Sequence, residues 1–448
     1  MADKLHSQLD AMEALLDVNK LLDEKAHDQG IMFTTMDPNL RVKSGLSTGM
    51  YSFDLITGGG YAPGRFSYLY GDTGSGKSTT CYHGMKSALE KKIIVDVNDH
   101  ESSMDPGYLK KIGIDLDDVC GRRNKKGKWE VTPKLRYSMG TTAEATFRFM
   151  NMVMKGLPDK IQMWDDKAEV HKYYVIAPDF SYKPMWSYIT KGLKEGKIFE
   201  VEDFSPQMVF VTDSLKAMLP EARDEDMDSD PIALLARCFS NTFPLVKSLL
   251  GRKNCIYLAT NHLTINPMCK FGNPETEPGG KAVQFYPDLK IKMHVNRAQN
   301  KIIEETHVSG DGIDRYILGK ATVLKNKSGP CFRATEFRLW LDEQGNPGRG
   351  IDPVFDVFTF LSSCGLIEQP SKTTYGINIQ GWETQSFTWK KFKELVLIRE
   401  EGKALRTQIE EMLADGTAQE LYYQTLATGS STVKAKGDAD DKIETVEL

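Results

Sequence analysis

At positions 71 to 79 the chain reads Gly71-Asp72-Thr73-Gly74-Ser75-Gly76-Lys77-Ser78-Thr79, a full match to the pattern G-x-x-x-x-G-K-[ST]. Glycines in this pattern let successive backbone N–H groups surround phosphate oxygens at the start of a helix, whose dipole also favours negative charge. Lys77 is placed to reach the β- and γ-phosphates, and Ser78 to supply a hydroxyl to Mg²⁺. The stretch therefore predicts a site for a nucleoside triphosphate.

The sequence around this phosphate loop favours an α/β fold. Residues 66–70 form a β-prone run before the loop, and residues 79–89 have the pattern of a helix after it. Further buried strands are expected at 92–97, 208–212 and 255–259, within an alternation of strands and helices that is typical of a parallel sheet covered on both faces. Each strand is followed by polar residues, and such residues gather beyond the carboxyl ends of the strands, where ligands bind in open α/β sheets.

Composition excludes several classes of protein. The seven cysteines are scattered and include no C-x-x-C pair, which argues against a disulfide framework and a zinc site and favours a reducing, cytoplasmic compartment. No apolar run is long enough to cross a membrane, and the first ten residues are polar, unlike a signal sequence. The net charge of −5 argues against a nucleic-acid partner, but residues 437–448 alone contribute −4, so the rest of the chain can still present a basic groove.

The segments outside the strand–helix alternation differ in character. Residues 3–27 have the period of an amphipathic helix, and residues 30–36 read as an edge strand of this chain or as a strand donated to a neighbouring subunit. Residues 121–128 form a basic loop, residues 141–155 a helix, and residues 160–206 an aromatic-rich stretch with no assigned structure or function. A smaller α-rich region follows residue 345, and the polar, acidic residues 429–448 are expected to be disordered.

Carboxylates at the strand ends are candidates for the rest of the nucleotide site. Asp213 ends an apolar strand, where it can support Mg²⁺ opposite Ser78; the alternative is that it caps a short helix. Glu101 follows another strand end and can orient and deprotonate the attacking water, although the local pattern favours it only slightly over Asp99. Tyr108 is a candidate for stacking on a base.

Three blocks of the sequence closely resemble the RecA family of homologous recombinases. The resemblance is to a phage-type or a divergent bacterial-type member. The first block, within residues 44–118, surrounds the phosphate loop and carries Ser47-Thr48-Gly49, Phe53-Asp54, Gly58-Gly59-Gly60, Pro63-Gly64-Arg65, Glu101, Asp105-Pro106-Gly107-Tyr108 and Gly113-Ile114-Asp115. The other two lie within residues 208–345 and carry Phe271-Gly272-Asn273-Pro274-Glu275-Thr276, Gly279-Gly280, Phe285-Tyr286, Val323-Leu324-Lys325-Asn326-Lys327, Phe332 and Glu336-Phe337. The resemblance is looser over residues 5–43 and weak beyond residue 350.

The resemblance implies a fold and its boundaries. We expect a RecA-like phosphate-loop ATPase core over residues 44–345, with a mainly parallel twisted sheet and an insertion at about 160–206. An N-terminal arm over residues 1–43 would carry the oligomerisation helix and strand. A small α-rich C-terminal domain would cover residues 346–428, before the acidic tail.

The resemblance also implies roles for individual residues. Lys77, Ser78 and Thr79 would bind the phosphates and Mg²⁺, Asp213 would support Mg²⁺, and Glu101 would activate water. Asp105 and Tyr108 would contact adenine. Lys325 and Lys327 would reach ATP held by the adjacent subunit, so that the active site exists only between protomers.

Two loops resemble the DNA-binding loops of the family, at residues 221–231 and 263–280. Glycine and proline there indicate a mobile loop, and nearby cations can meet DNA phosphates. The candidate DNA-binding residues in and beside these loops are Arg223, Arg237, Lys270, Phe271, Gly272, Asn273, Gly279, Gly280 and Lys281.

The sequence departs from the bacterial pattern in two places. His262 follows Asn261, as in phage-type relatives, whereas bacterial members usually have glutamine at this position. A histidine can still donate to a γ-phosphate and report its presence to the following loop, although its number of donors depends on pH. The second departure is the extra material at residues 160–206, which the bacterial members lack.

These observations predict a DNA-dependent ATPase that uses ATP and Mg²⁺, forms a homo-oligomeric helical filament on single-stranded DNA and exchanges strands with homologous duplex DNA. Loader and single-strand-binding proteins are further candidate partners. Three alternatives remain: a hexameric helicase motor of the same superfamily, a filament scaffold that binds ATP without hydrolysing it, and a small-molecule kinase. The first is disfavoured by the blocks at 271–280 and 325–327, the second requires Glu101 to be misplaced, and the third predicts ATPase activity that is indifferent to DNA.

Overall fold

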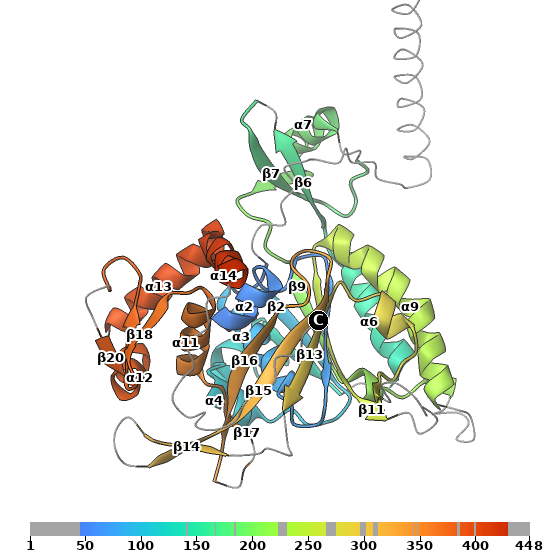
Figure 1. Cartoon of the computed structure of the whole chain (residues 1–448). Helices are drawn as coiled ribbons and strands as arrows, with labels where there is room; N and C mark the ends of the chain where they lie inside the picture. Colours follow the sequence, from blue (N-terminus) through green and yellow to red (C-terminus); the bar gives the residue numbers. More distant parts are fainter. Residues whose placement is uncertain are drawn as a thin grey trace, which may run out of the picture. The chain divides into compact units, whose positions relative to one another are not determined.

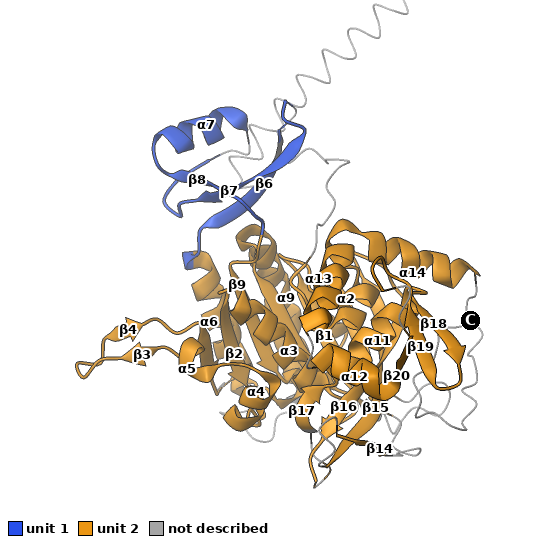
Figure 2. Cartoon of the chain, turned by 90° about the vertical axis from the view of Figure 1, so that its left-hand side faces the viewer, with its two compact units in different colours: residues 1–41, 156–204 blue, residues 42–155, 205–448 orange. Residues whose placement is uncertain are grey.

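The computed structural model describes residues 45–139, 142–165, 167–182, 185–222, 231–265, 275–295, 302–307, 312–343, 345, 347–382, 386–397 and 400–428. Two compact units are distinguished in Figure 2: unit 1 comprises residues 1–41 and 156–204, and unit 2 comprises residues 42–155 and 205–448. The predicted N-terminal helix and strand and the predicted acidic tail lie outside the described residues, and the predicted domain boundaries remain predictions.

Unit 2 is built on one ten-stranded sheet (Figure 1). Six strands run parallel, in the spatial order β13 (Leu289–Val295), β1 (Phe66–Gly71), β10 (Ile256–His262), β9 (Met208–Asp213), β2 (Ile94–Asp99) and β5 (Leu135–Ser138). Beyond β13 the sheet continues with antiparallel strands: β15 (Ile313–Asn326), β16 (Ala334–Leu341) and β17 (Pro347–Ile351), with β14 (Ile303–Thr306) paired to β15. The expected α/β fold with a mainly parallel sheet is confirmed.

The expected strands and helices of the core are found with small shifts. The runs at 66–70, 208–212 and 255–259 are β1, β9 and β10, and the expected helices at 79–89 and 141–155 are α3 (Lys77–Glu90) and α6 (Ala143–Gly156). Strand β2 begins at Ile94, two residues later than expected. The reason is that Lys92 takes a left-handed φ of 60° in the turn that follows α3.

Helices cover both faces of the parallel strands. On one face, side chains of α3 such as Met85 join Leu69, Leu258 and Val211 in the largest buried cluster. On the other face, Phe147 of α6 packs on Tyr257 of β10, and Phe243 of α9 (Pro231–Lys253) packs on Phe66 of β1. Both faces being covered explains why β1 and β9 are buried along their whole length and read as continuous apolar runs.

The segment after β17 is helical, as expected, but it also contains a small sheet. Its helices are α11 (Pro353–Ser363), α12 (Trp389–Leu397), α13 (Glu400–Asp415) and α14 (Thr417–Thr428), and its antiparallel strands are β18 (Ile367–Ser371), β19 (Thr374–Ile377) and β20 (Ser386–Thr388). They enclose a second buried cluster. Asp356 of α11 accepts hydrogen bonds from the backbone N–H groups of Tyr51 and Ser52, so this segment caps the start of α2 (Tyr51–Thr57).

The aromatic-rich stretch, for which the sequence indicated no structure, folds as a small antiparallel sheet with one helix. Its strands are β6 (Asp159–Asp165), β7 (Val170–Ile176) and β8 (Ile198–Val201), and its helix is α7 (Trp186–Lys194). Ile161, Tyr174, Ile176, Ile189 and Ile198 form its own buried cluster, to which both the helix and the sheet contribute. This stretch, which includes most of the described part of unit 1, therefore has a core of its own.

The predicted basic loop is a short β-hairpin, drawn in Figure 2 as a ribbon that extends from unit 2 beside α5 (Leu116–Val119). Its strands are β3 (Arg122–Arg123) and β4 (Trp129–Val131).

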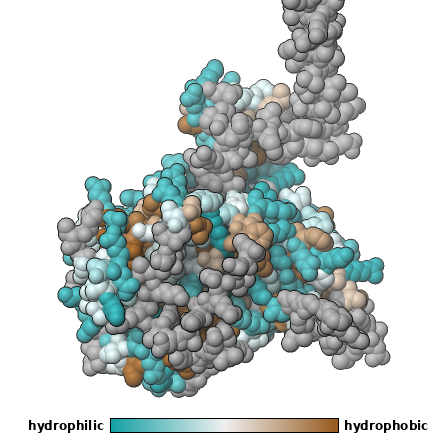
Figure 3. Space-filling view, viewed as in Figure 1, coloured by the Kyte–Doolittle hydropathy of each residue, from teal (hydrophilic) through white to brown (hydrophobic). Residues whose placement is uncertain are grey.

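No helix in the described part of the chain is long and apolar enough to cross a membrane. On the described residues of the face in Figure 3, hydrophobic side chains are scattered among hydrophilic ones.

Candidate nucleotide and DNA site

The phosphate loop requires glycine at two positions for different reasons. A Cβ atom on Gly71 would lie 1.9 Å from the carbonyl oxygen of Met293, because β1 and β13 run side by side there. Gly76 caps α3 with a left-handed φ of 86°, which L side chains rarely adopt. The two glycines allow the backbone to turn sharply from strand to helix, with the first N–H groups of α3 directed toward the loop.

Lys77 lies at the base of this loop. Its Nζ atom donates a hydrogen bond to the carbonyl oxygen of Asp72 at 2.7 Å, and the residue is 5% exposed. Burial lowers the pKa of Lys77 to about 8, although Asp213 and Glu101 partly offset this effect. The described residues place no carboxylate within ion-pair distance of Lys77, so a phosphate would give this ammonium the anionic partner that it lacks.

Asp213 and Ser78 form the candidate Mg²⁺ site. The Oδ1 atom of Asp213 accepts a hydrogen bond from Thr260 at 2.5 Å, whereas its buried Oδ2 atom has no hydrogen-bond partner among the described residues. Burial raises the pKa of Asp213, which a divalent cation would reverse. An orphaned carboxylate oxygen near a hydroxyl suits Mg²⁺, which prefers oxygen ligands.

The described part of the chain has no group of three or more His, Cys, Asp or Glu side chains that could hold a metal ion by itself. Mg²⁺ at Ser78 and Asp213 would therefore need nucleotide phosphates and water as its remaining ligands. The alternative was a helix N-cap at Asp213-Ser214; the residue that caps the short helix at Leu215–Ala217 is Ser214, and its side chain makes no capping hydrogen bond.

Glu101 is held in place by two other strand ends. Its Oε1 atom accepts a hydrogen bond from the hydroxyl of Ser214, next to the end of β9, and lies 2.8 Å from Nε2 of His262, the last residue of β10. The other ring nitrogen of His262 lies 3.4 Å from the hydroxyl of Thr73 in the phosphate loop. These contacts, with that of His262 first, lower the pKa of Glu101 to about 2. Glu101 is therefore an ionised carboxylate beside the phosphate loop.

Asp99, the other candidate base, is already hydrogen-bonded to backbone N–H groups. It is 1% exposed, and its two carboxylate oxygens accept hydrogen bonds from the backbone N–H groups of Glu101 and Met104 and from the hydroxyl of Tyr137. These bonds shape the turn after β2 and leave Asp99 little capacity to bind water. The geometry therefore favours Glu101 over Asp99, a distinction that the local sequence barely made.

The residues predicted to contact adenine lie next to the helix of the phosphate loop. Asp105 caps α4 (Pro106–Ile112) by accepting hydrogen bonds from the backbone N–H groups of Gly107 and Tyr108. The hydroxyl of Tyr108 lies 2.9 Å from that of Thr79 in α3. Tyr108 is thus positioned beside the nucleotide site, and contact of either residue with a base remains a prediction.

Asn261 links this site to the following loop, a connection that the sequence did not reveal. Its buried side-chain amide donates hydrogen bonds to the hydroxyl of Tyr68 and to the carbonyl oxygen of Pro278, each at 2.9 Å. The same loop is tied to β13 by an ion pair between Glu277 and Lys290, at 2.9 Å. The only sequence signal for this link was the run of polar residues at the end of β10. It did not identify the partner of Asn261, because Pro278 lies seventeen residues farther along the chain.

Lys325 and Lys327 lie at the opposite edge of the sheet from the phosphate loop. Lys325 pairs in register with Lys290, near the start of β13, whereas Gly71 pairs with Met293. The Nζ atom of Lys325 donates to two carbonyl oxygens before β13, and Lys327 lies 3.9 Å from the carboxylate of Asp288. The two lysines are therefore displaced from the phosphate loop of their own chain.

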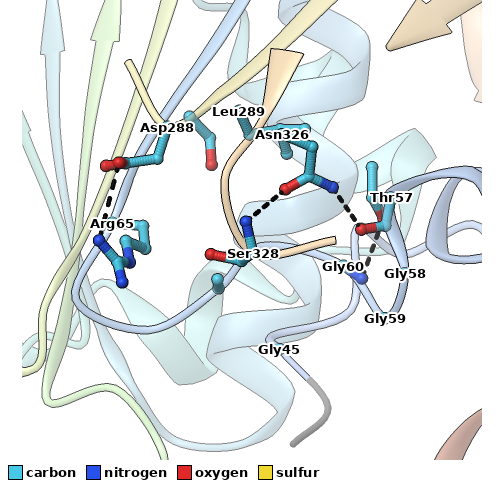
Figure 4. A pocket seen from close by; sticks show the side chains of 12 residues that line it. Gly45, Thr57, Gly58, Gly59, Gly60, Arg65, Asp288, Leu289, Asn326 and Ser328 are labelled. Atoms are coloured by element: carbon cyan, nitrogen blue, oxygen red, sulfur yellow. Dashed lines mark hydrogen bonds and ion pairs between the residues drawn. The ribbon is translucent and has the colours of Figure 1, made fainter. Parts of the chain in front are cut away.

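Asp288 is the centre of a cationic cluster at this edge, which also comprises Arg65, Lys247, Lys325 and Lys327. Asp288 is only 1% exposed; its carboxylate lies 2.7 Å from Lys247 and, as Figure 4 shows, lies beside Arg65, at 3.7 Å, on one side of a pocket that both residues line. Burial and the neighbouring cations lower the pKa values of Lys325 and Lys327. One carboxylate thus faces four cations, an arrangement that favours a further anion.

The candidate DNA-binding residues are only partly within the described chain. Arg223, Lys270, Phe271, Gly272 and Asn273 lie outside it. Arg237 is exposed on α9, and the exposed Lys281 precedes α10 (Ala282–Phe285).

Two glycines of the second loop serve packing. A Cβ atom on Gly279 would lie 2.7 Å from the ring of Phe239, and one on Gly280 would lie 2.9 Å from the side chain of Ala236; both glycines have left-handed φ angles. Glycine here lets the loop end pack tightly on α9, beside Arg237. These two glycines therefore have a packing role, and mobility of the loop stays a prediction.

Comparisons with known proteins agree with the sequence motifs. A family model described as the RecA N-terminal domain matches residues 13–131 and 201–345, and its gap includes all of the stretch from β6 to α7. The protein RecA of Arthrospira platensis is 23% identical over 348 residues, covering 77% of this chain and 73% of that protein. The protein RecA of Thermus aquaticus is 24% identical over 335 residues, covering 74% and 75%. The crystal structure of the RadB recombinase aligns at 17% identity with a TM-score of 0.36, covering 68% of this chain and 98% of that one.

Proposed function

The chain belongs to the family of the RecA N-terminal domain, and from this premise we propose that it is a DNA-dependent ATPase that assembles on single-stranded DNA and catalyses homologous pairing and strand exchange. ATP with Mg²⁺ is the proposed substrate, and the proposed partners are single-stranded DNA, homologous duplex DNA and further copies of the chain in a helical filament, in the cytoplasm. One observation carries the proposal: Lys77, Asp213 and Glu101 meet at the ends of β1, β9 and β2, which together with β10 form a run of four adjacent parallel strands.

The proposed reaction is in-line attack by water on the γ-phosphate. Glu101 orients the water and accepts its proton as the new P–O bond forms and the bond to the β,γ-bridging oxygen breaks. Lys77 neutralises the charge that develops on the phosphates. When bound by Ser78 and Asp213, Mg²⁺ would supply further charge neutralisation.

His262 offers a way to couple the nucleotide to the loop. Its ring contacts Glu101, and this contact is the largest cause of the low pKa of Glu101. We infer that a γ-phosphate draws His262 away from Glu101, which raises the basicity of Glu101. The adjacent Asn261 is bonded to Pro278, so the same movement would reach the predicted DNA-binding loop.

The position of Lys325 and Lys327 supports a site shared between subunits. Along β13, the residue opposite Lys325 precedes the residue opposite Gly71 by three positions, or about 10 Å. Lysines at that edge would contact the nucleotide bound by an adjacent copy of the chain. A head-to-tail contact of this kind generates a ring or an open helix, according to whether the rotation closes.

The test is ATP hydrolysis measured with and without single-stranded DNA, beside electron microscopy of the same samples. Stimulation of hydrolysis by DNA together with helical filaments is the expected result. Rings would instead indicate a helicase motor. Filaments without ATP turnover would indicate a scaffold, and hydrolysis that DNA does not stimulate would indicate a kinase.

A further inference from the structure

The β3–β4 hairpin, residues 121–131, concentrates positive charge in a chain whose net charge is −5. Its cationic side chains are those of Arg122, Arg123, Lys125, Lys126 and Lys128, against the single carboxylate of Glu130. All five cationic residues are exposed, and the described part of the chain supplies none of them with a carboxylate in ion-pair contact. Uncompensated charge on a projecting ribbon attracts polyanions.

The turn that presents these cations has a defined shape. The side-chain oxygen of Asn124 accepts hydrogen bonds from the backbone N–H groups of Lys126 and Lys128, at 2.9 and 3.1 Å. The backbone of Asn124 also exchanges hydrogen bonds with Lys128 and Gly127, which has a left-handed φ of 76°. Because the turn is already bonded, the lysines lose less entropy on binding than they would on a floppy loop.

An aromatic residue supports the ribbon. The guanidinium carbon of Arg123 lies 4.1 Å from the centre of the Trp129 ring, directly across the two strands, and Trp129 is 44% exposed. This contact holds Arg123 in place, and its Nη1 atom also donates to the carbonyl oxygen of Gly127 at 3.5 Å. Trp129 thus has a local packing role, and Arg123 is best left intact in any test.

Within unit 2, the hairpin lies apart from Gly279 and Gly280, at the described end of the second predicted DNA-binding loop. It precedes β5, whose first residue Leu135 pairs with Val95 near the start of β2. The loop that ends at Gly280 follows β10, at the edge where the parallel strands end. Three strand spacings, about 14 Å, separate β10 from β5, and the two features lie at opposite edges of the sheet. The hairpin is therefore a separate surface.

We propose that this basic hairpin is a second DNA-binding element, which contacts the phosphate backbone of duplex DNA. Duplex DNA carries about one charge per 1.7 Å of helix axis, which matches a dense cluster of cations. A two-stranded ribbon also fits a major groove of about 12 Å. This inference rests on the proposed function, because strand exchange requires a second DNA molecule to be held apart from the single strand.

The test compares two full-length variants with the same loss of charge. One replaces three hairpin lysines, K125A/K126A/K128A; the control replaces three exposed lysines elsewhere, K110A/K111A/K194A. Binding of fluorescent 30-base-pair duplex and 30-nucleotide single-stranded DNA is measured by anisotropy with ATP and Mg²⁺ across salt concentrations. ATP hydrolysis stimulated by single-stranded DNA is measured on the same samples.

We expect the hairpin variant to bind duplex DNA at least tenfold more weakly at about 50 mM salt, with a log–log salt slope reduced by about 3, since each phosphate contact contributes roughly 0.9. Single-strand binding and stimulated hydrolysis should match those of the control. Unchanged duplex binding, or equal losses for duplex and single strand, would overturn the inference. Absence of DNA-stimulated hydrolysis in the unmodified protein would instead contradict the proposed function, and duplex binding would still be measurable.

Discussion

The two edges of the parallel sheet carry opposite and unbalanced charge. At the edge where the strands end, the carboxylates of Asp213 and Glu101 lie near the ammonium of Lys77, although neither forms an ion pair with it. At the edge where they begin, four cations surround the single carboxylate of Asp288.

This difference supports the proposal that neither edge is a complete site. As proposed, the first edge would hold a metal ion and position water, with Lys77 as the ammonium of its phosphate loop. The second edge has spare cations but no phosphate loop. Joining the first edge of one copy to the second edge of the next would satisfy both, which is a head-to-tail contact.

The largest expected effect is a loss of hydrolysis that distinguishes Glu101 from Asp99, the last residue of β2. Glu101→Gln should lower hydrolysis by about 10²–10⁴-fold while ATP binding persists, because the base is lost but the phosphate loop is intact. Asp99→Asn should act mainly on stability, lowering the free energy of unfolding by about 1–3 kcal/mol, since Asp99 holds backbone N–H groups. Turnover and chemical denaturation measured on both variants check this; near-normal turnover in Glu101→Gln would reassign the base.

Mixing experiments test whether the two edges complete each other. Subunits with Lys77→Ala and subunits with K325A/K327A should each be inactive alone. Mixed in equal amounts, they should regain hydrolysis at roughly a quarter of the interfaces, because a head-to-tail contact can join the intact edges of two copies. No recovery at any ratio would show that the lysines act within their own chain or not at all.

The buried cation of the first edge predicts proton uptake on ATP binding. The pKa of Lys77 is lowered to about 8, so at pH 8.5 roughly three quarters of these groups are neutral before binding. A triphosphate favours the charged form, so binding at pH 8.5 should take up a proton, whereas binding at pH 6.5 should not involve Lys77. Calorimetry in buffers of different ionisation enthalpy measures the uptake. Equal uptake in Lys77→Ala would assign the proton to another group.

The smallest expected effect concerns the carboxylate of the second edge. Asp288→Asn should lower the free energy of unfolding by about 1–3 kcal/mol, because Lys247 loses its partner at 2.7 Å. Lys247→Met should cost a similar amount, and the double variant should cost less than the two single effects combined, since both remove one contact. Additive losses, measured by denaturant unfolding, would mean that Asp288 acts mainly through its other contacts.

Features encoded within a few neighbouring residues were predictable from the sequence. The phosphate loop from Gly71 to Thr79 needs a particular run of backbone conformations, and only a few residue types permit them. The apolar strands leading to Gly71, Asp213 and His262 were predictable because burial on both faces imposes a continuous hydrophobic run. Family membership follows from the same local blocks.

Features that depend on pairing between distant residues were decided only by the tertiary structure. Glu101 was barely distinguishable from Asp99 until the fold brought Ser214 and His262, 113 and 161 residues away along the chain, onto its carboxylate. The sequence suggested a mobile loop at Gly279. Only the fold shows that this glycine packs against the ring of Phe239, where a side chain would not fit.

By itself, therefore, the sequence determined the predicted phosphate-binding loop, because one contiguous stretch supplies all of its residues. The tertiary structure decided which carboxylate faces that cradle, that the cations of the second edge lie away from it, and that the basic loop is a ribbon with a bonded turn. The physical reason is that electrostatic and hydrogen-bonding contacts depend on distance in space, which a linear pattern specifies only when the partners are close neighbours in the chain.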